Sequence, residues 1–248
     1  MSDGSETNTP FQERAYRQLV RSHLTAARVV VQQTDLGIYS DRPVAEAAKE
    51  AVIEQRSYLE GYIRRNPEFV RTLRPFPEDP LAPPIVRKMI AAGRAADVGP
   101  MAAVAGAVAE QVGHQLLKQS SEVVVENGGD IFIHTHQPMT VGLYAGPSPL
   151  SLKIGLRIAA DAGVHAVCTS SGTVGHSLSF GRADAVCVLS GGCALADAAA
   201  TAVGNRVRAA NDIPAAIRWG RDIAGVLGLL IVVGDKMGAW GAIEVVRL

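Results

Sequence analysis

The stretch EVVVENGGDIFIH, residues Glu122–His134, decides the class of fold. Two strand-like runs, 122–126 and 131–134, flank the turn-forming residues Asn127-Gly128-Gly129, which predicts two strands joined by a turn. Further strands are separated both by turns and by helical segments, and this alternation favours an α+β layered domain with a mixed or antiparallel sheet and packed helices over a βαβ repeat. The other expected strands are Thr25–Gln32, Leu36–Ser40, Val141–Tyr144, Leu152–Ile158, His165–Thr169, Ala183–Leu189, Gly228–Gly234 and Ala242–Arg247.

Turn and capping signals place the first elements. The first two strands are expected to form a hairpin that turns at Thr34-Asp35. A long amphipathic helix follows, with Asp41 as its cap, Pro43 in its first turn and Asn66-Pro67 at its end. The other expected helices are Pro84–Ala96, Gly99–Leu117 and Ala194–Val207.

Composition limits the class of protein. The chain has 248 residues, 24 basic and 24 acidic side chains and 48% apolar residues, and its length fits one large domain or two small ones. The first residues are rich in Ser, Thr, Asp and Gly, which indicates a flexible tail over residues 1–12. The neutral charge gives no reason to expect nucleic acid or a membrane as partner. The longest apolar run, Val226–Val233, is far shorter than a membrane span. Three cysteines in apolar surroundings favour a reduced, cytoplasmic protein without a secretory signal.

Three glycine-rich places are candidates for ligand binding. The first is a helix start at Gly99, the second surrounds Gly128, and the third is the hydroxyl-rich segment 169–177. Free backbone N–H groups and hydroxyls in such places suit phosphate oxygens, although ordinary turns select the same residues. The candidate residues are Gly99, Asn127, Gly128, Gly129, Asp130, Thr169, Ser170, Ser171, Gly172, Thr173, His176 and Ser177.

A fourth candidate is a metal site. Asp197 and Thr201 lie four residues apart on the expected helix Ala194–Val207, so they share one face. A carboxylate and a hydroxyl offer two oxygens to Mg²⁺, which takes water and phosphate oxygens at its other positions. The alternative is that Asp197 caps this helix or a nearby turn while Thr201 packs.

Several familiar signatures are absent or incomplete. The sequence has neither G-x-G-x-x-G nor G-x-x-x-x-G-K-[ST], and no histidine follows Ser177, which excludes the chain order of an α/β-hydrolase triad. His134 and His136 form a candidate metal pair, for which an exposed turn before the next proline is the favoured interpretation. Cys168 and Cys187 can face each other across strands, but we favour buried thiols that act as small apolar residues.

Five segments together resemble the uncharacterised ApbE-like protein family, which is related to the FAD:protein FMN transferases. These segments are VGPMAAVAGAVAE (Val98–Glu110), VENGGDIFI (Val125–Ile133), AGPSPLS (Ala145–Ser151), TSSGTVGHSLSFGRADAV (Thr169–Val186) and ADAAATAVGN (Ala196–Asn205). The likeness extends upstream through TDLGIYS (Thr34–Ser40) and RSYLEGYIRRNPEF (Arg56–Phe69). The resemblance implies a single ApbE-like domain over residues 13–248.

The transferase relatives imply roles for matching residues. Their N-x-G-G-D segment beside the flavin nucleotide resembles Asn127–Asp130, and their T-S-G loop resembles Thr169–Gly172 with one extra residue here. Their A-D-A-x-x-T-A helix, whose Asp and Thr hold Mg²⁺, resembles Ala196–Ala202 and implies a metal at Asp197 and Thr201. Their H-x-x-D-P-x-T-G segment has no counterpart in Ser177–Asp184.

The leading hypothesis is therefore an ApbE-like protein that binds FAD, a related flavin nucleotide or another pyrophosphate-containing ligand with Mg²⁺. A Mg²⁺-dependent enzyme that processes FAD or transfers FMN is one form of it, with no catalytic residue assigned. One alternative is a non-catalytic protein that binds a small phosphorylated ligand, which the missing histidine segment favours. The other is a homo-oligomeric scaffold without a ligand.

Overall fold

The computed structural model describes residues 24–160, 163, 165–173 and 180–248. Its helices are α1 (Ala45–Arg65), α2 (Glu68–Arg71), α3 (Pro84–Ala96), η2 (Pro100–Ala103), α4 (Val104–Leu116), α5 (Cys193–Gly204), η3 (Ala210–Asp212) and α6 (Ile213–Gly220). Its strands are β1 (Thr25–Val31), β2 (Thr34–Ser40), β3 (Val123–Asn127), β4 (Asp130–His134), β5 (Met139–Gly142), β6 (Ile154–Ile158), β7 (His165–Ser170), β8 (Ala185–Ser190), β9 (Val226–Val233), β10 (Lys236–Gly241) and β11 (Glu244–Arg247). The α+β class is confirmed.

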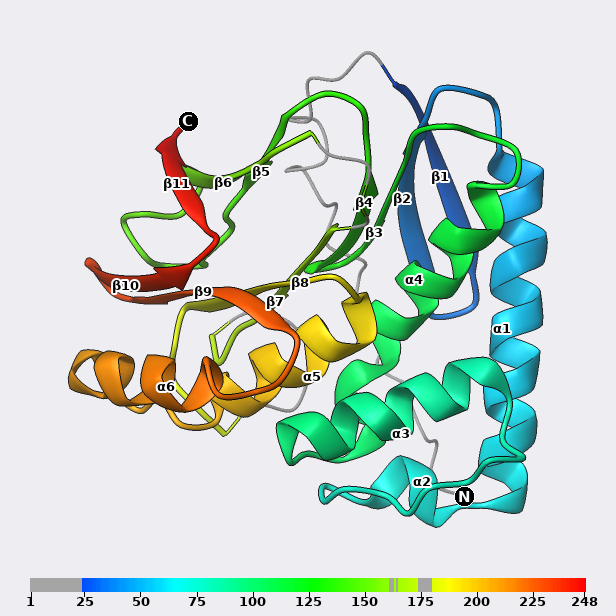
Figure 1. Ribbon diagram of the computed structural model, residues 1–248, viewed down its shortest axis with the longest axis horizontal. Helices are drawn as coiled ribbons and strands as arrows, with labels where there is room; N and C mark the ends of the chain where they lie inside the picture. The colour runs from blue at the N-terminus through cyan, green and yellow to red at the C-terminus, as the bar shows by residue number, and fades with distance from the viewer. Residues whose placement is uncertain (1–23, 161–162, 164, 174–179) are drawn as a thin grey trace, which may run out of the picture.

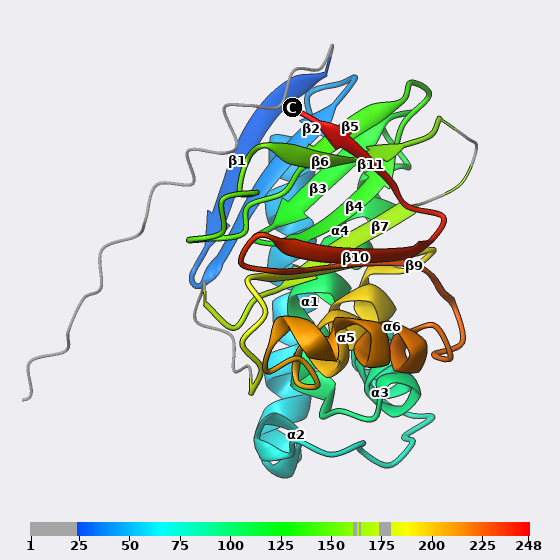
Figure 2. The same cartoon turned by 90° about the vertical axis from the view of Figure 1, so that its left-hand side faces the viewer.

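An antiparallel sheet of eight strands forms the centre of the molecule, in the order β1-β2-β3-β4-β7-β8-β9-β10. The helices cover one face of this sheet, and a second sheet, in the order β11-β6-β5, lies on the other side (Figure 1). The view turned by 90° shows the same arrangement (Figure 2). No helix of the described residues is long and apolar enough to cross a bilayer.

The central strands are buried on both faces because a hydrophobic cluster lies on each side. In β4, Phe132 belongs to the cluster under the helices and the next residue, Ile133, to the cluster under the small sheet. Side chains alternate along a strand, so a run of apolar residues fills both layers. This explains why Val123–Val125 is apolar throughout and does not alternate with polar residues.

The positions of several elements differ from the sequence predictions. The first hairpin turns at Gln32-Gln33, where Gln32 adopts a positive φ of 51°, and not at Thr34-Asp35. Asp41 does not cap α1, which begins at Ala45 without a side-chain cap. The Asp41 carboxylate instead accepts hydrogen bonds from the backbone and hydroxyl of Ser121 at 3.0 and 2.8 Å. It thereby joins the start of α1 to the start of β3.

The predicted helix Gly99–Leu117 is divided into η2 and α4, and the helix predicted at Ala194–Val207 is observed as α5. Cys168 and Cys187 lie on adjacent strands, but Cys168 is opposite Val188 and belongs to the helix-side cluster, whereas Cys187 belongs to the other. These two thiols therefore do not face each other. All three cysteines are buried, as the favoured interpretation predicts.

The helix α4 lies close to the sheet because Gly113 has no side chain. A Cβ at Gly113 would lie 2.3 Å from Cδ1 of Phe132, far inside van der Waals contact. The Phe132 ring is fully buried, so it has little room to move away. A glycine inside a helix costs about 1 kcal/mol relative to alanine, and here it permits the close contact between helix and sheet.

We predict that Gly113→Ala destabilises the protein by about 1–3 kcal/mol, because the added methyl overpacks the contact with Phe132. Gly61→Ala in α1 is the matched control, since a Cβ there meets only the flexible end of Arg64 at 3.8 Å. Its stability should stay equal or rise by up to about 1 kcal/mol. Urea denaturation followed by circular dichroism measures both, and equal stabilities would contradict this account.

Candidate functional site

Helices α4 and α5 cross at Gly106, where α4 has no side chain. A Cβ at Gly106 would lie 2.3 Å from the carbonyl oxygen of Cys193 and 2.8 Å from Cβ of Asp197. Only glycine fits there without displacing backbone. This crossing places Asp197, on the second turn of α5, directly over the first turn of α4.

Each of the two helices receives a carboxylate from the other at its N-terminal end. Gly106 N donates to Oδ2 of Asp197 at 2.9 Å, and Ala194 N donates to Oε2 of Glu110 at 3.1 Å. The first N–H groups of a helix have no partner within it, and the positive end of the helix dipole favours an anion. The exchange of carboxylates therefore stabilises the crossing at both ends.

The Glu110 carboxylate is buried and compensated by a cation. Lys88 Nζ on α3 donates to its Oε1, and His114 Nε2 lies 3.9 Å from the same oxygen. The surroundings of Asp197 differ, since the groups that act on its charge are the backbone N–H groups of Ala105 and Gly106 and the neighbouring Asp130. No basic side chain of the described residues is among them. Asp197 therefore lacks the cationic compensation that Glu110 has.

Burial raises the pKa of Asp197 well above its usual value, and the negative charge of Asp130 raises it further. The two backbone hydrogen bonds lower it, but by less. The residue as a whole is half-buried. Asp130, the first residue of β4, is itself buried with 7% exposure. The two carboxyl groups therefore lie close enough for the charge of one to act on the other.

The second glycine-rich segment lies beside this carboxylate pair. Asn127 Nδ2 donates to the carbonyl of Ala105 at 3.0 Å, which joins the turn before β4 to the start of α4. Gly128 adopts a positive φ of 73°. Gly129 approaches β7 so closely that a Cβ would lie 2.6 Å from the carbonyl oxygen of Thr169. The sheet register and these contacts bring the second and third segments together.

The third segment continues from β7 toward the C-terminal end of α5. Ser170 Oγ lies 3.9 Å from the position of a Cβ at Gly204, and Gly172 N donates to the carbonyl of Ala183 at 2.9 Å. Thr173 Oγ1 donates to the buried carboxylate of Asp184 at 3.2 Å, and its backbone N donates to Ser171 Oγ at 3.0 Å. The hydroxyl group of Ser170 thus lies near the last residue of α5, the helix that carries Asp197 and Thr201.

The remaining predicted residues have different positions. Thr201 is half-buried one turn after Asp197. Gly99 is buried, and a Cβ there would lie 2.0 Å from the carbonyl oxygen of Thr72, so this glycine permits a close backbone contact. The predictions for His176 and Ser177 concern positions outside the described residues. One alternative from the sequence is that Asp197 acts as a cap. It does cap a helix, but that helix is α4 and not its own helix α5.

Sequence analysis missed Glu110 and Gly106 as site-building residues. Glu110 interrupts the small-residue pattern AVAGAVAEQ in α4, and an isolated acidic residue in such an apolar helix signals a buried partner. No pattern of spacing along the chain indicates that its partner is Ala194, 84 residues away.

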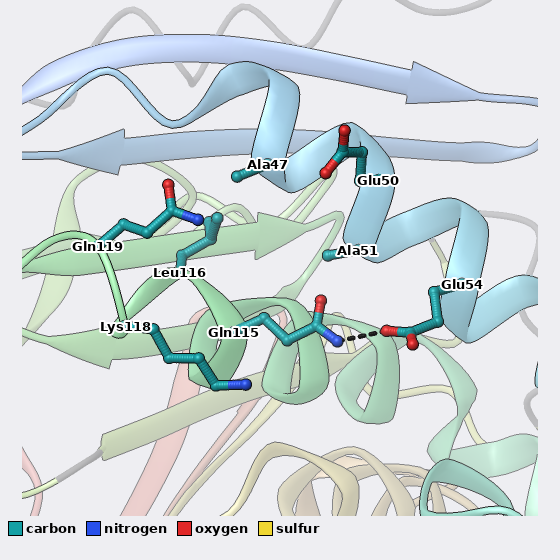
Figure 3. Close-up of a pocket in the computed structure, with 8 residues that line it drawn as sticks. All are labelled: Ala47, Glu50, Ala51, Glu54, Gln115, Leu116, Lys118 and Gln119. Carbon is teal, nitrogen blue, oxygen red and sulfur yellow. Dashed lines mark hydrogen bonds between the residues drawn. The ribbon is translucent and has the colours of Figure 1, made fainter.

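Two surface grooves lie away from these residues. A groove of about 400 Å³ between α1 and the end of α4 contains a hydrogen bond from Gln115 to Glu54 (Figure 3). Its lining residues also include Glu50 on α1 and Lys118 in the turn after α4 (Figure 3). A second groove, of about 590 Å³, lies between α6 and β10. Neither groove is lined by a predicted site residue.

Comparison with known proteins agrees with this architecture. A family model described as AbpE bacteria matches residues 17–222. The chain belongs to this family. It is 40% identical over 222 residues to a UPF0280 protein of Methanocaldococcus jannaschii, covering 87% of this chain and 90% of the relative. It is 41% identical over 234 residues to a UPF0280 protein of Methanothrix thermoacetophila, covering 93% and 94%.

Solved structures with the same fold include flavin transferases. The apo form of the Pseudomonas stutzeri flavinyl transferase ApbE matches with a TM-score of 0.58 at 12% identity, covering 88% of this chain and 94% of that one. A mutant of the flavin transferase ApbE from Vibrio cholerae matches with a TM-score of 0.57 at 12% identity, covering 89% and 98%. At this identity the likeness shows the ApbE-like fold.

The raised pKa of Asp197 predicts a pH-dependent stability. When the pKa of a carboxyl group is higher in the folded than in the unfolded protein, the free energy of unfolding decreases as pH rises from the unfolded value, about 4, through the folded one. Denaturation in EDTA should show this decrease for the unmodified protein. Asp197→Asn should lack it, because its amide oxygen can still accept from Gly106.

Asp222→Asn is the control, since Asp222 is exposed at the C-terminal end of α6. It should leave the pH profile of the free energy of unfolding unchanged. If Asp197→Asn retains the full decrease between acidic and neutral pH, the charge of Asp197 is compensated in the folded protein and this account is wrong.

Proposed function

We propose that the protein binds a pyrophosphate-containing nucleotide, of which FAD or a related flavin nucleotide is the leading candidate, together with Mg²⁺ at the half-buried residues Asp197 and Thr201 of α5. The observation that carries the proposal is the carboxylate of the half-buried residue Asp197, which lies beside Asp130 and on whose charge no basic side chain of the described residues acts. An uncompensated carboxylate attracts a divalent cation. The ApbE-like fold of flavin transferases supports the flavin part of the proposal.

The donor set suits Mg²⁺ better than a softer metal. Asp197 and Thr201 offer hard oxygen ligands one helical turn apart, and Asp130 adds negative charge nearby. A carboxylate has about four lone-pair sites, so hydrogen bonds from Ala105 and Gly106 leave acceptor capacity for an ion. Within the described residues, no three His, Cys, Asp or Glu side chains gather around one metal position. Such a site leaves coordination positions for water and phosphate oxygens, which is typical of Mg²⁺.

The glycine-rich segments then hold the rest of the ligand. Ser170 lies near the end of α5, and the turn at Gly128-Gly129 directly precedes Asp130. These residues and Ser171 are half-buried or exposed. Neutral hydrogen-bond donors of this kind orient phosphate oxygens. When bound, Mg²⁺ supplies the positive charge that stabilises the pyrophosphate group. The residues Asp197 and Thr201 orient the ligand by fixing where that charge lies.

A non-catalytic protein that binds the same class of ligand is the second candidate. It is favoured by one specific observation, namely that Ser177–Asp184 lacks the H-x-x-D-P segment of the transferase relatives. Both candidate functions use the Asp197 site, so only a measurement of reaction products can distinguish an enzyme from a binding protein.

For the binding proposal, we predict that FAD binds tightly in Mg²⁺ and weakly in EDTA, measured by the change in flavin fluorescence. Asp197→Ala should weaken the Mg²⁺-dependent binding by at least tenfold, because the charged ligand of the ion is lost. Thr201→Val should weaken it by a smaller factor, since it removes one neutral oxygen. Asp222→Asn and Thr140→Val, both at exposed positions on other elements, are the matched controls. Equal affinities in Asp197→Ala and the unmodified protein would rule out this site.

The second prediction distinguishes an enzyme from a binding protein. We expect release of FMN or AMP from FAD only if other groups of this chain replace the missing histidine segment. Incubation of FAD with Mg²⁺ and separation of products by chromatography measures this directly. Release of FMN or AMP that disappears in Asp197→Ala selects the enzyme. Tight Mg²⁺-dependent binding of FAD without either product selects the binding protein.

A further inference from the structure

A pair of imidazole side chains lies at the opposite end of β4 from Asp130. His134 is the last residue of β4 and His136 follows two residues later, with their ring centroids 5.9 Å apart and an interplanar angle of 72°. Asp130 and His134 are four residue steps apart along the strand, which corresponds to about 13 Å. The pair is therefore separate from the site on α5.

The backbone fixes the tautomer of the first imidazole. Nδ1 of His134 lies 3.2 Å from the carbonyl oxygen of Gly163. A carbonyl only accepts, so Nδ1 carries the hydrogen and the neutral ring keeps its lone pair on Nε2. Histidines that bind metals almost always donate their other ring N–H to a carbonyl or carboxylate in this way. His134 therefore has the orientation and tautomer of a metal ligand.

A buried carboxylate fixes the main chain at the second imidazole. His136 N donates to Oε1 of Glu122 at 2.7 Å, and Glu122 is only 7% exposed. The residue His136 is exposed, while His134 is half-buried. The pair thus has one ring that the fold orients and one ring that can adjust to a ligand from the solvent, with a negative charge nearby.

The spacing of the rings is close to that of two imidazoles on one metal ion. With Zn–N distances of about 2.0–2.1 Å and tetrahedral angles, the two ring centres lie about 5 Å apart. The observed separation is 5.9 Å, and the exposed ring of His136 has room to turn toward a shared ion. Imidazole ligands select Zn²⁺, Ni²⁺ and Cu²⁺ over Mg²⁺, which prefers oxygen.

We propose that His134 and His136 together bind one late first-row divalent metal ion, with Zn²⁺ as the probe ion. No group of three potential protein ligands is found within the described residues, so water or an external ligand completes the coordination. The proposal does not depend on a nucleotide or on Mg²⁺.

The matched control is a third histidine on the neighbouring strand. His165 is directly opposite Ile133 in the register of β4 and β7. Residues opposite each other share a face, and successive residues alternate, so His165 lies on the other face of the sheet from His134. Substitution of His165 removes one imidazole from the same region without touching the pair.

The test is isothermal titration calorimetry of ZnCl₂ into the full chain, with excess Mg²⁺ to occupy oxygen sites. We expect a Zn²⁺ site whose affinity falls at least tenfold in His136→Gln and in His134→Gln but changes less than twofold in His165→Gln. The exposed position of His136 makes that variant the least disruptive to folding, and circular dichroism verifies the fold. The NMR resonances of the two rings should shift together with one equivalent of Zn²⁺.

Three results would overturn the proposal. They are the absence of Zn²⁺ binding, the same affinity in His136→Gln as in the unmodified protein, and an equal loss in His165→Gln. Mg²⁺-dependent FAD binding that stays intact in His136→Gln shows that the two sites are independent. A failure of this proposal therefore leaves the proposed function untouched, and the reverse also holds.

Discussion

The close approach of α4 to α5 at Gly106 is the constraint on which the rest of the candidate site depends. Because no side chain separates the helices there, Asp197 reaches the free N–H groups at the start of α4 and Glu110 reaches those at the start of α5. Each helix thus supplies the anion that the other's N-terminus attracts. The crossing also brings the turn at Asn127 into contact with α4 through the carbonyl of Ala105.

The carboxylates of Glu110 and Asp197 have different electrostatic surroundings. This difference distinguishes Glu110, which we regard as structural, from Asp197, the proposed metal ligand. Glu110 is buried and paired with Lys88, so its charge is compensated within the fold. Asp197 lies beside Asp130, and burial together with that neighbour raises its pKa. A group held in an unfavourable electrostatic state is often one that a ligand stabilises. The cationic ligand proposed here would supply to Asp197 what Lys88 supplies to Glu110.

Local signals predicted much of the scaffold and failed in specific places. The helix at Pro84–Ala96 has the predicted bounds because a proline at its start is a strong local signal. The strand β10 (Lys236–Gly241) was missed, since this edge strand pairs only with β9 and has few apolar residues to reveal its period. Asp41 had the right residue type for a cap, but Ser120 and Ser121, some 80 positions away, bind its carboxylate.

The sequence by itself determined the α+β class, the family resemblance and the presence of Asp197 and Thr201 on one helical face, because periodicity and motif spacing are local properties of the chain. Only the tertiary structure decided that Asp197 lies beside Asp130, and that it caps α4 and not its own helix. These relations join segments tens of residues apart through strand register and helix crossing. Register and crossing are set by the packing of the whole core, which no single stretch of sequence specifies.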